Sequence, residues 1–105
     1  MQTSTGRLPM TVITLVSEHD KELQPLVKSA IDNELRLLEA GLLQTAQRLK
    51  QFEKKFNVKT SDFIRRYEND EIEETLDAAE WIGEFRMHER FIEKIEALKG
   101  IRFAH

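Results

Sequence analysis

The chain has 105 residues, of which 33% are charged and 40% apolar, and its formal net charge is −3. This length supports one domain with a modest core, and four glycines and two prolines suit long helices better than a compact β domain. Because cysteine is absent, a disulfide framework, a thiolate nucleophile and a cysteine zinc site are excluded, and we expect a protein of the reducing cytoplasm.

The first residues precede any periodic pattern. Residues 1–9 have one cation and no long apolar stretch, so we expect a flexible extension rather than a signal peptide, followed by one domain over residues 10–105. No apolar run approaches the roughly 20 residues that a membrane helix needs, so no membrane is expected as a partner. Residues 11–16 are rich in β-branched side chains and predict a short strand-like arm. It would pair with a second copy or a partner, or lie loosely on the helices.

A long helix follows this arm. Ser17 or Asp20 can cap it, and Pro25 is expected in its first turn, where a missing N–H is tolerated. The helix is predicted to run to about Phe56, with Asn57 ending it in the left-handed conformation.

The long helix contains an apolar seam in which the steps alternate between three and four residues. Such a stripe packs lengthwise against another helix and is a candidate oligomer seam, formed by Leu35, Leu38, Leu42, Leu49, Phe52 and Phe56. Thr45 is its polar member, and it either sets the register of a coiled coil or bonds back to the carbonyl of Gly41.

Two further helices are predicted. Thr60 or Ser61 can cap a short one over residues 62–68, and the break at residues 69–70 separates it from a third helix over residues 72–99. The third helix has a broad apolar stripe, expected to form the core, of Leu76, Ala79, Trp81, Ile82, Phe85, Phe91, Ile92, Ile95 and Leu98.

The expected fold is all-α. A short connection makes the two long helices antiparallel, which gives a coiled-coil-like helical hairpin with a short helix at its tip. Leu37 and Leu43 lie off the seam, and one hairpin partner cannot cover all of this apolar surface. We therefore expect a homodimer in which two hairpins form a four-helix bundle.

Charge is distributed unevenly. Residues 21–59 contain eight basic and five acidic residues, whereas residues 60–80 contain two basic and eight acidic ones. The acidic segment is a candidate docking surface for a basic partner, or simply a solvated face, and comprises Glu68, Asp70, Glu71, Glu73, Glu74, Asp77 and Glu80.

A basic end precedes the acidic segment, and nucleic-acid phosphates could bind its Arg48, Lys50, Lys54, Lys55, Lys59, Arg65 and Arg66. Ordinary surface cations near the end of a helix, where they are also stabilising, are the favoured explanation. Without helix-turn-helix spacing or interleaved aromatic residues, nucleic acid is not the favoured partner.

Residues for catalysis are not grouped in the sequence. Di-iron sites of helical bundles use a Glu and a His three residues apart, whereas Glu84 and His88 are four apart and no second Glu/His pair is present on the long helix. An ion pair therefore explains them better than a metal site. The nearest approach to a metal-dependent nucleotide pyrophosphatase is two glutamate pairs on one predicted helix, Glu71 with Glu74 and Glu93 with Glu96. No triad or phosphate loop is present. We expect no enzyme, no catalytic residue, no metal and no cofactor.

The central part of the chain resembles a family. Its residues 54–63 read KKFNVKTSDF, residues 67–72 read YENDEI and residues 76–85 read LDAAEWIGEF. With the opening segment, they resemble small helical proteins of cyanobacteria and archaea that are considered antitoxin-like and are encoded beside a small toxin. The family usually has a Tyr-Gly-Met-like turn where this chain has residues 56–58.

This resemblance implies a non-catalytic protein-interaction module that binds and neutralises a small toxin. The alternative is a structural or adaptor coiled-coil dimer without a toxin. A metal-dependent nucleotide pyrophosphatase is the third hypothesis.

Overall fold

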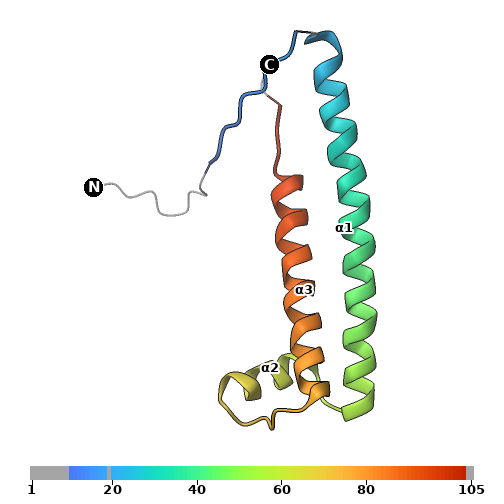
Figure 1. Ribbon diagram of the computed structural model, residues 1–105, viewed down its shortest axis with the longest axis vertical. Helices are drawn as coiled ribbons and strands as arrows, with labels where there is room; N and C mark the ends of the chain where they lie inside the picture. Colours follow the sequence, from blue (N-terminus) through green and yellow to red (C-terminus); the bar gives the residue numbers. More distant parts are fainter. Residues whose placement is uncertain (1–9, 19, 104–105) are drawn as a thin grey trace, which may run out of the picture.

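The computed structural model describes residues 10–18 and 20–103, in which there are three helices and no strand. These are α1 (Asp20–Phe56), α2 (Thr60–Glu68) and α3 (Leu76–Lys99). In Figure 1, α1 and α3 run side by side in opposite directions, and α2 lies at the end where the chain connects them. The all-α helical hairpin with a short tip helix is therefore confirmed. The expected extension over residues 1–9 lies outside the described residues.

α1 has 37 residues and so is about 55 Å long at 1.5 Å per residue. It ends at Phe56 as predicted, and Asn57 has a positive φ of 55°, the left-handed conformation that asparagine tolerates. Pro25 is not in the first turn, because the helix begins five residues before it. At that position, proline removes one backbone hydrogen bond of α1.

α2 is capped from another helix rather than by its own residues. It begins at Thr60, and the residue before it, Lys59, makes no side-chain cap hydrogen bond. The Thr60 N–H instead donates to Oε2 of Glu53 on α1, at 2.8 Å. Hydrogen bonds from the backbone and side chain of Thr60 lower the pKa of the Glu53 carboxyl. A carboxylate of α1 thus takes the role that the sequence assigned to Thr60 or Ser61.

α3 begins four residues later than predicted. Thr75 is its N-cap, and the Thr75 hydroxyl accepts a hydrogen bond from the Ala78 N–H at 3.1 Å. The residues before Thr75 form an irregular connection in which Asp70 has a φ of 62°. The C-terminal end agrees with the prediction, since α3 stops at Lys99.

The main core cluster lies at the tip, where all three helices meet. Its centre is Trp81, which is 2% exposed. The Trp81 ring stacks on Phe63 at a centroid distance of 4.0 Å and on Phe52 at 5.5 Å, while its Nε1–H donates to the Thr60 hydroxyl at 3.0 Å. The Trp81 side chain of α3 therefore contacts both α1 and α2 at the tip.

Candidate interaction surfaces

The predicted seam of α1 packs against α3 of the same chain. Leu38, Thr45 and Leu49 are buried, whereas Phe56, at the end of the seam, is 42% exposed. The other members are half-buried, namely Leu35, Leu42 and Phe52. The seam therefore holds the hairpin together within one chain, and a contact of the seam with a second copy stays a prediction.

Thr45 makes a buried polar contact across the hairpin. Its hydroxyl donates to the carbonyl of Leu42 at 2.9 Å and lies 2.9 Å from Nδ1 of His88. Because a hydroxyl has one proton, the Thr45 oxygen must accept its second hydrogen bond from Nδ1–H of His88. The back-bond is thus made one residue away from the predicted acceptor, Gly41, and His88 has a structural partner.

Two residues of the basic end bridge to α3. Arg48 contacts Glu84 at 3.1 Å, and Lys55 contacts Asp77 at 3.0 Å. Oε1 of Glu84 is buried and has no hydrogen-bond partner among the described residues. These ion pairs bridge the two long helices, so part of the basic end has partners within the chain.

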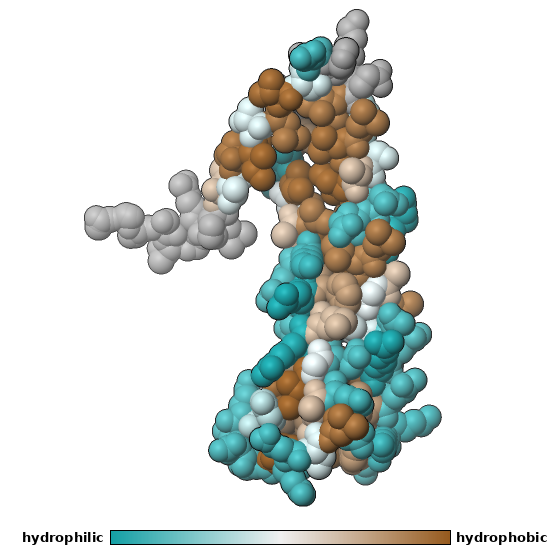
Figure 2. All heavy atoms as spheres, viewed as in Figure 1, coloured by the Kyte–Doolittle hydropathy of each residue, from teal (hydrophilic) through white to brown (hydrophobic). Residues whose placement is uncertain are grey.

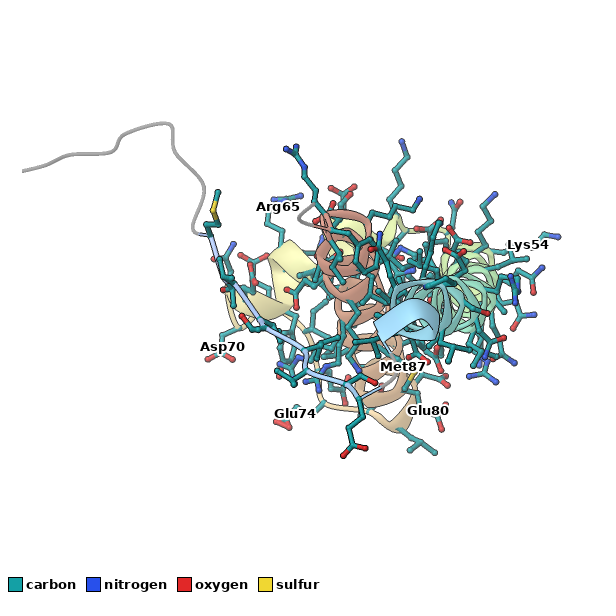
Figure 3. All side chains as sticks on the ribbon, turned by 90° about the horizontal axis from the view of Figure 1, so that it is seen from above. Lys54, Arg65, Asp70, Glu74, Glu80 and Met87 are labelled. Atoms are coloured by element: carbon teal, nitrogen blue, oxygen red, sulfur yellow. The ribbon has the colours of Figure 1, made fainter. Side chains whose placement is uncertain are left out.

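The acidic segment is almost wholly exposed. Asp77 is half-buried and paired with Lys55, and the remaining members lie on the surface around the tip. Asp70 and Glu74 lie on one side of α2 in Figure 3, and Arg65 lies on the other. The structure thus brings the predicted acidic residues together at one end of the hairpin.

A shallow apolar cleft opens beside the acidic segment, between α2 and the start of α3. Its volume is about 280 Å³, and its lining includes Val58, Phe63, Ile72 and Trp81, with Arg66 and Glu73 among its polar members. An apolar cleft next to exposed carboxylates is suited to a partner that presents both an apolar and a basic side chain.

The two glutamate pairs do not converge. Glu71 and Glu74 lie in the connection before α3, and Glu93 and Glu96 lie near its far end. Glu93 lies about 25 Å along α3 from its first residue, Leu76, at 1.5 Å per residue. Among the described residues, no three His, Asp or Glu side chains are grouped as metal ligands. No described helix is both long and apolar enough to cross a membrane.

The arm, residues 10–18, runs outside the two long helices in both Figure 1 and Figure 3. It forms neither helix nor strand. Its large apolar side chains remain in solvent, with exposed fractions of 78% for Ile13 and 91% for Val16. The arm is the part of the described chain where apolar residues are most continuously exposed.

The helices have further exposed apolar residues. Leu37 and Leu43, which lie off the seam, are 61% and 60% exposed, and on α3 Leu76 and Met87 are also exposed. In Figure 2, brown surface is concentrated in the upper part of the view, over the arm and the start of α1, and teal surface dominates around the tip. The hydrophobic spacing of α3 predicts burial for Leu76, and the structure shows instead that its side chain is 75% exposed.

Comparison with protein-family models, curated proteins and solved structures gave no match.

Proposed function

We propose that this chain is a non-catalytic, antitoxin-like interaction module, whose hairpins form a homodimeric body and whose exposed arm binds a small toxin protein. The observation that supports this proposal most directly is the exposure of the apolar arm. Burying apolar surface of this kind against another molecule is favourable, because it removes apolar area from water.

The arm has the composition of a β-strand that could pair with a strand of a partner protein. Alternate residues of an extended chain point to opposite sides, so Val12, Thr14 and Val16 share one face while Ile13 and Leu15 share the other. An extended segment of this type can add to the edge of a partner's sheet, where main-chain hydrogen bonds give affinity and side-chain pockets give specificity. Burying four such side chains contributes about 6–12 kcal/mol before the costs of association.

The acidic segment favours a basic partner. Its exposed carboxylates, including Glu68 and Glu73, lie at the end of the hairpin away from the start of α1. Complementary charge accelerates encounter and disfavours partners of the same sign. The acidic segment lies at the opposite end of α1 from the arm, so a small basic toxin would contact it separately from the arm.

A growth assay tests the proposal. The small protein encoded by the neighbouring gene is expressed alone and then with this chain, and growth is recorded. We expect arrest when it is expressed alone, rescue by the wild-type chain, and loss of rescue with Ile13→Asp in the arm. Leu43→Asp, an equally drastic change at an exposed residue of α1, is the control and should preserve rescue. Harmless expression of the neighbour alone would contradict the toxin proposal and leave the adaptor hypothesis.

A further inference from the structure

We call the apolar cleft between α2 and the start of α3 the tip cleft. All three helices and both connections contribute apolar side chains to its lining, namely Phe56, Val58, Phe63, Ile72, Ala78 and Trp81. Phe56 stacks on Trp81 at a centroid distance of 5.7 Å and is itself 42% exposed. The tip cleft therefore offers a partner apolar contact at the edge of the core cluster.

The tip cleft has the size of one large side chain. Its volume is about 280 Å³, which is below the roughly 300–1,000 Å³ of typical small-molecule pockets. An apolar cavity of about 150 Å³ is enough to hold a benzene ring. A side chain of the size of leucine or phenylalanine therefore fits, whereas a larger ligand would extend out of the cleft.

Polar groups beside the apolar lining are already hydrogen-bonded within the chain. The Thr75 hydroxyl accepts from the Ala78 N–H at 3.1 Å, and Trp81 Nε1–H donates to the Thr60 hydroxyl at 3.0 Å. A polar ligand would gain little from groups that are occupied in this way. Burial of an apolar group is therefore the favourable contact for this cleft.

The connection before α3 forms an acidic wall of the tip cleft. Residues 70–75 read DEIEET, so four carboxylates surround Ile72, and none of them is ion-paired with another described residue. Glu73 lines the cleft, and Glu71 and Glu74 are each next in sequence to a residue that lines it. Neighbouring Cα atoms are about 3.8 Å apart, less than the Debye length of about 8 Å, so salt screens these charges only partly at the cleft.

The cations near the tip cleft do not cancel this acidic wall. Arg66 of α2 is the basic residue of the lining and balances Glu73, the acidic one. Lys55 is paired with Asp77 at 3.0 Å. Residues 60–80 contain eight acidic and two basic residues, so the charge around the cleft stays negative. An apolar side chain that arrives with cations beside it complements both the cleft and its surroundings.

We propose that the tip cleft binds a short cationic segment of a partner protein. One large apolar side chain of this segment occupies the cleft, and lysine or arginine residues beside it face the side of α2 where Asp70 and Glu74 lie (Figure 3). This inference rests on the proposed function only in that the partner is a basic protein. It adds a contact at the tip, separate from the arm.

Short synthetic peptides test the tip cleft on the full wild-type chain. The probe is acetyl-Lys-Lys-Leu-Lys-Lys-amide, and two control peptides replace its leucine by serine or its lysines by glutamates. The fluorescence of Trp81, the single tryptophan, reports binding from within the lining. We expect a saturable change with the probe, at least tenfold weaker binding of the serine peptide, and no binding of the glutamate peptide. Equal binding of the leucine and serine peptides would mean that charge alone attracts them, and would overturn the proposal.

Two double charge reversals locate the bound peptide. Glu71→Lys with Glu73→Lys acts beside the cleft, whereas Glu93→Lys with Glu96→Lys makes the same change of charge at exposed residues near the far end of α3. We expect the first pair to weaken binding of the probe at least tenfold and the second pair at most about threefold. Equal weakening would indicate attraction to net charge rather than to the cleft and would contradict the proposal. The comparison of peptides on the wild type remains decisive if a variant fails to fold.

Ile13→Asp and sedimentation equilibrium separate the remaining outcomes. We expect Ile13→Asp in the arm to bind the probe as the wild type does, because the arm is not part of the cleft. Loss of probe binding in this variant would place the peptide on the arm, and dissociation of a wild-type dimer by the probe would show that a second copy covers the cleft. Either result, or no saturable change at millimolar probe, would overturn the tip cleft. The growth assay would still test the proposed function independently.

Discussion

The hydrogen bond between Trp81 and Thr60 gives a stability prediction that can be worked out from the structure. Thr60→Val keeps the shape of the side chain and removes the hydroxyl, which accepts from Trp81 Nε1–H at 3.0 Å and also hydrogen-bonds the Glu53 carboxyl. Both residues are buried, so water cannot easily replace the lost acceptor. A buried donor left without a partner costs about 1–3 kcal/mol, and we expect Thr60→Val to lower the free energy of unfolding by that amount.

Thr60→Ser is the matched control. It keeps the hydroxyl and loses one methyl group, which costs about 0.8 kcal/mol. Urea unfolding followed by circular dichroism at one fixed protein concentration measures both variants, because the stability of a dimer depends on concentration. The fluorescence of Trp81, the single tryptophan, reports on the same contact. If Thr60→Val were as stable as wild type while Thr60→Ser were destabilised, the hydrogen bond would not be what joins α3 to α2.

Three further predictions concern individual positions. Around Gly83 a Cβ would meet nothing within 4 Å, so Gly83→Ala should raise the free energy of unfolding, measured in urea, by about 0.5–1 kcal/mol. Gly41→Ala should give no such gain, and equal gains would contradict the close contact at Gly41. Thr75→Ala removes the cap of α3 and should cost about 1 kcal/mol in thermal unfolding, whereas Thr75→Ser should retain most of it, and equal losses would show that the hydroxyl is not the cap. Because the pKa of Glu53 is lowered in the fold, its contribution is complete above about pH 4.3 and is lost as pH falls through the lowered pKa. Urea titrations from about pH 6 to pH 2 should therefore show a shallower acid loss for Glu53→Gln, and parallel curves would refute this role.

The helices could be predicted where their signals are local. Apolar spacing and Asn57 define α1, and its end at Phe56 agrees with the structure. The predicted start of α3 is wrong because Ile72 continues the apolar spacing of the helix. Ile72 instead packs against the core cluster from an irregular connection. Hydrophobic spacing reports burial, and it cannot distinguish a helical turn from a loop whose side chain is also buried.

The contacts of the tip depend on residues that are distant in sequence. Threonine is a residue type that commonly caps helices. The Thr60 hydroxyl instead accepts a hydrogen bond from Trp81, 21 residues away. The cap of α2 comes from Glu53, which no local motif connects to it. Such pairings require the relative placement of three helices, which the sequence pattern of each one does not contain.

The candidate surfaces were only partly visible in the sequence. Charge counting located the acidic segment, and the off-seam positions Leu37 and Leu43 are indeed exposed. Met87 is 47% exposed on α3 without any distinct sequence signal. The molecule that covers the arm is not part of this chain. Binding measurements therefore test for it.

Calorimetric titration with the product of the neighbouring gene, which the proposal expects to be a small basic protein, tests the central claim most directly. The proposed function predicts a saturable complex with a fixed ratio of the two proteins, whose affinity falls at least 100-fold with Ile13→Asp in the arm and is unchanged with Leu43→Asp. Absence of binding by the folded wild-type chain, or equal affinities for the two variants, would contradict the claim that the arm is the site where a protein partner binds.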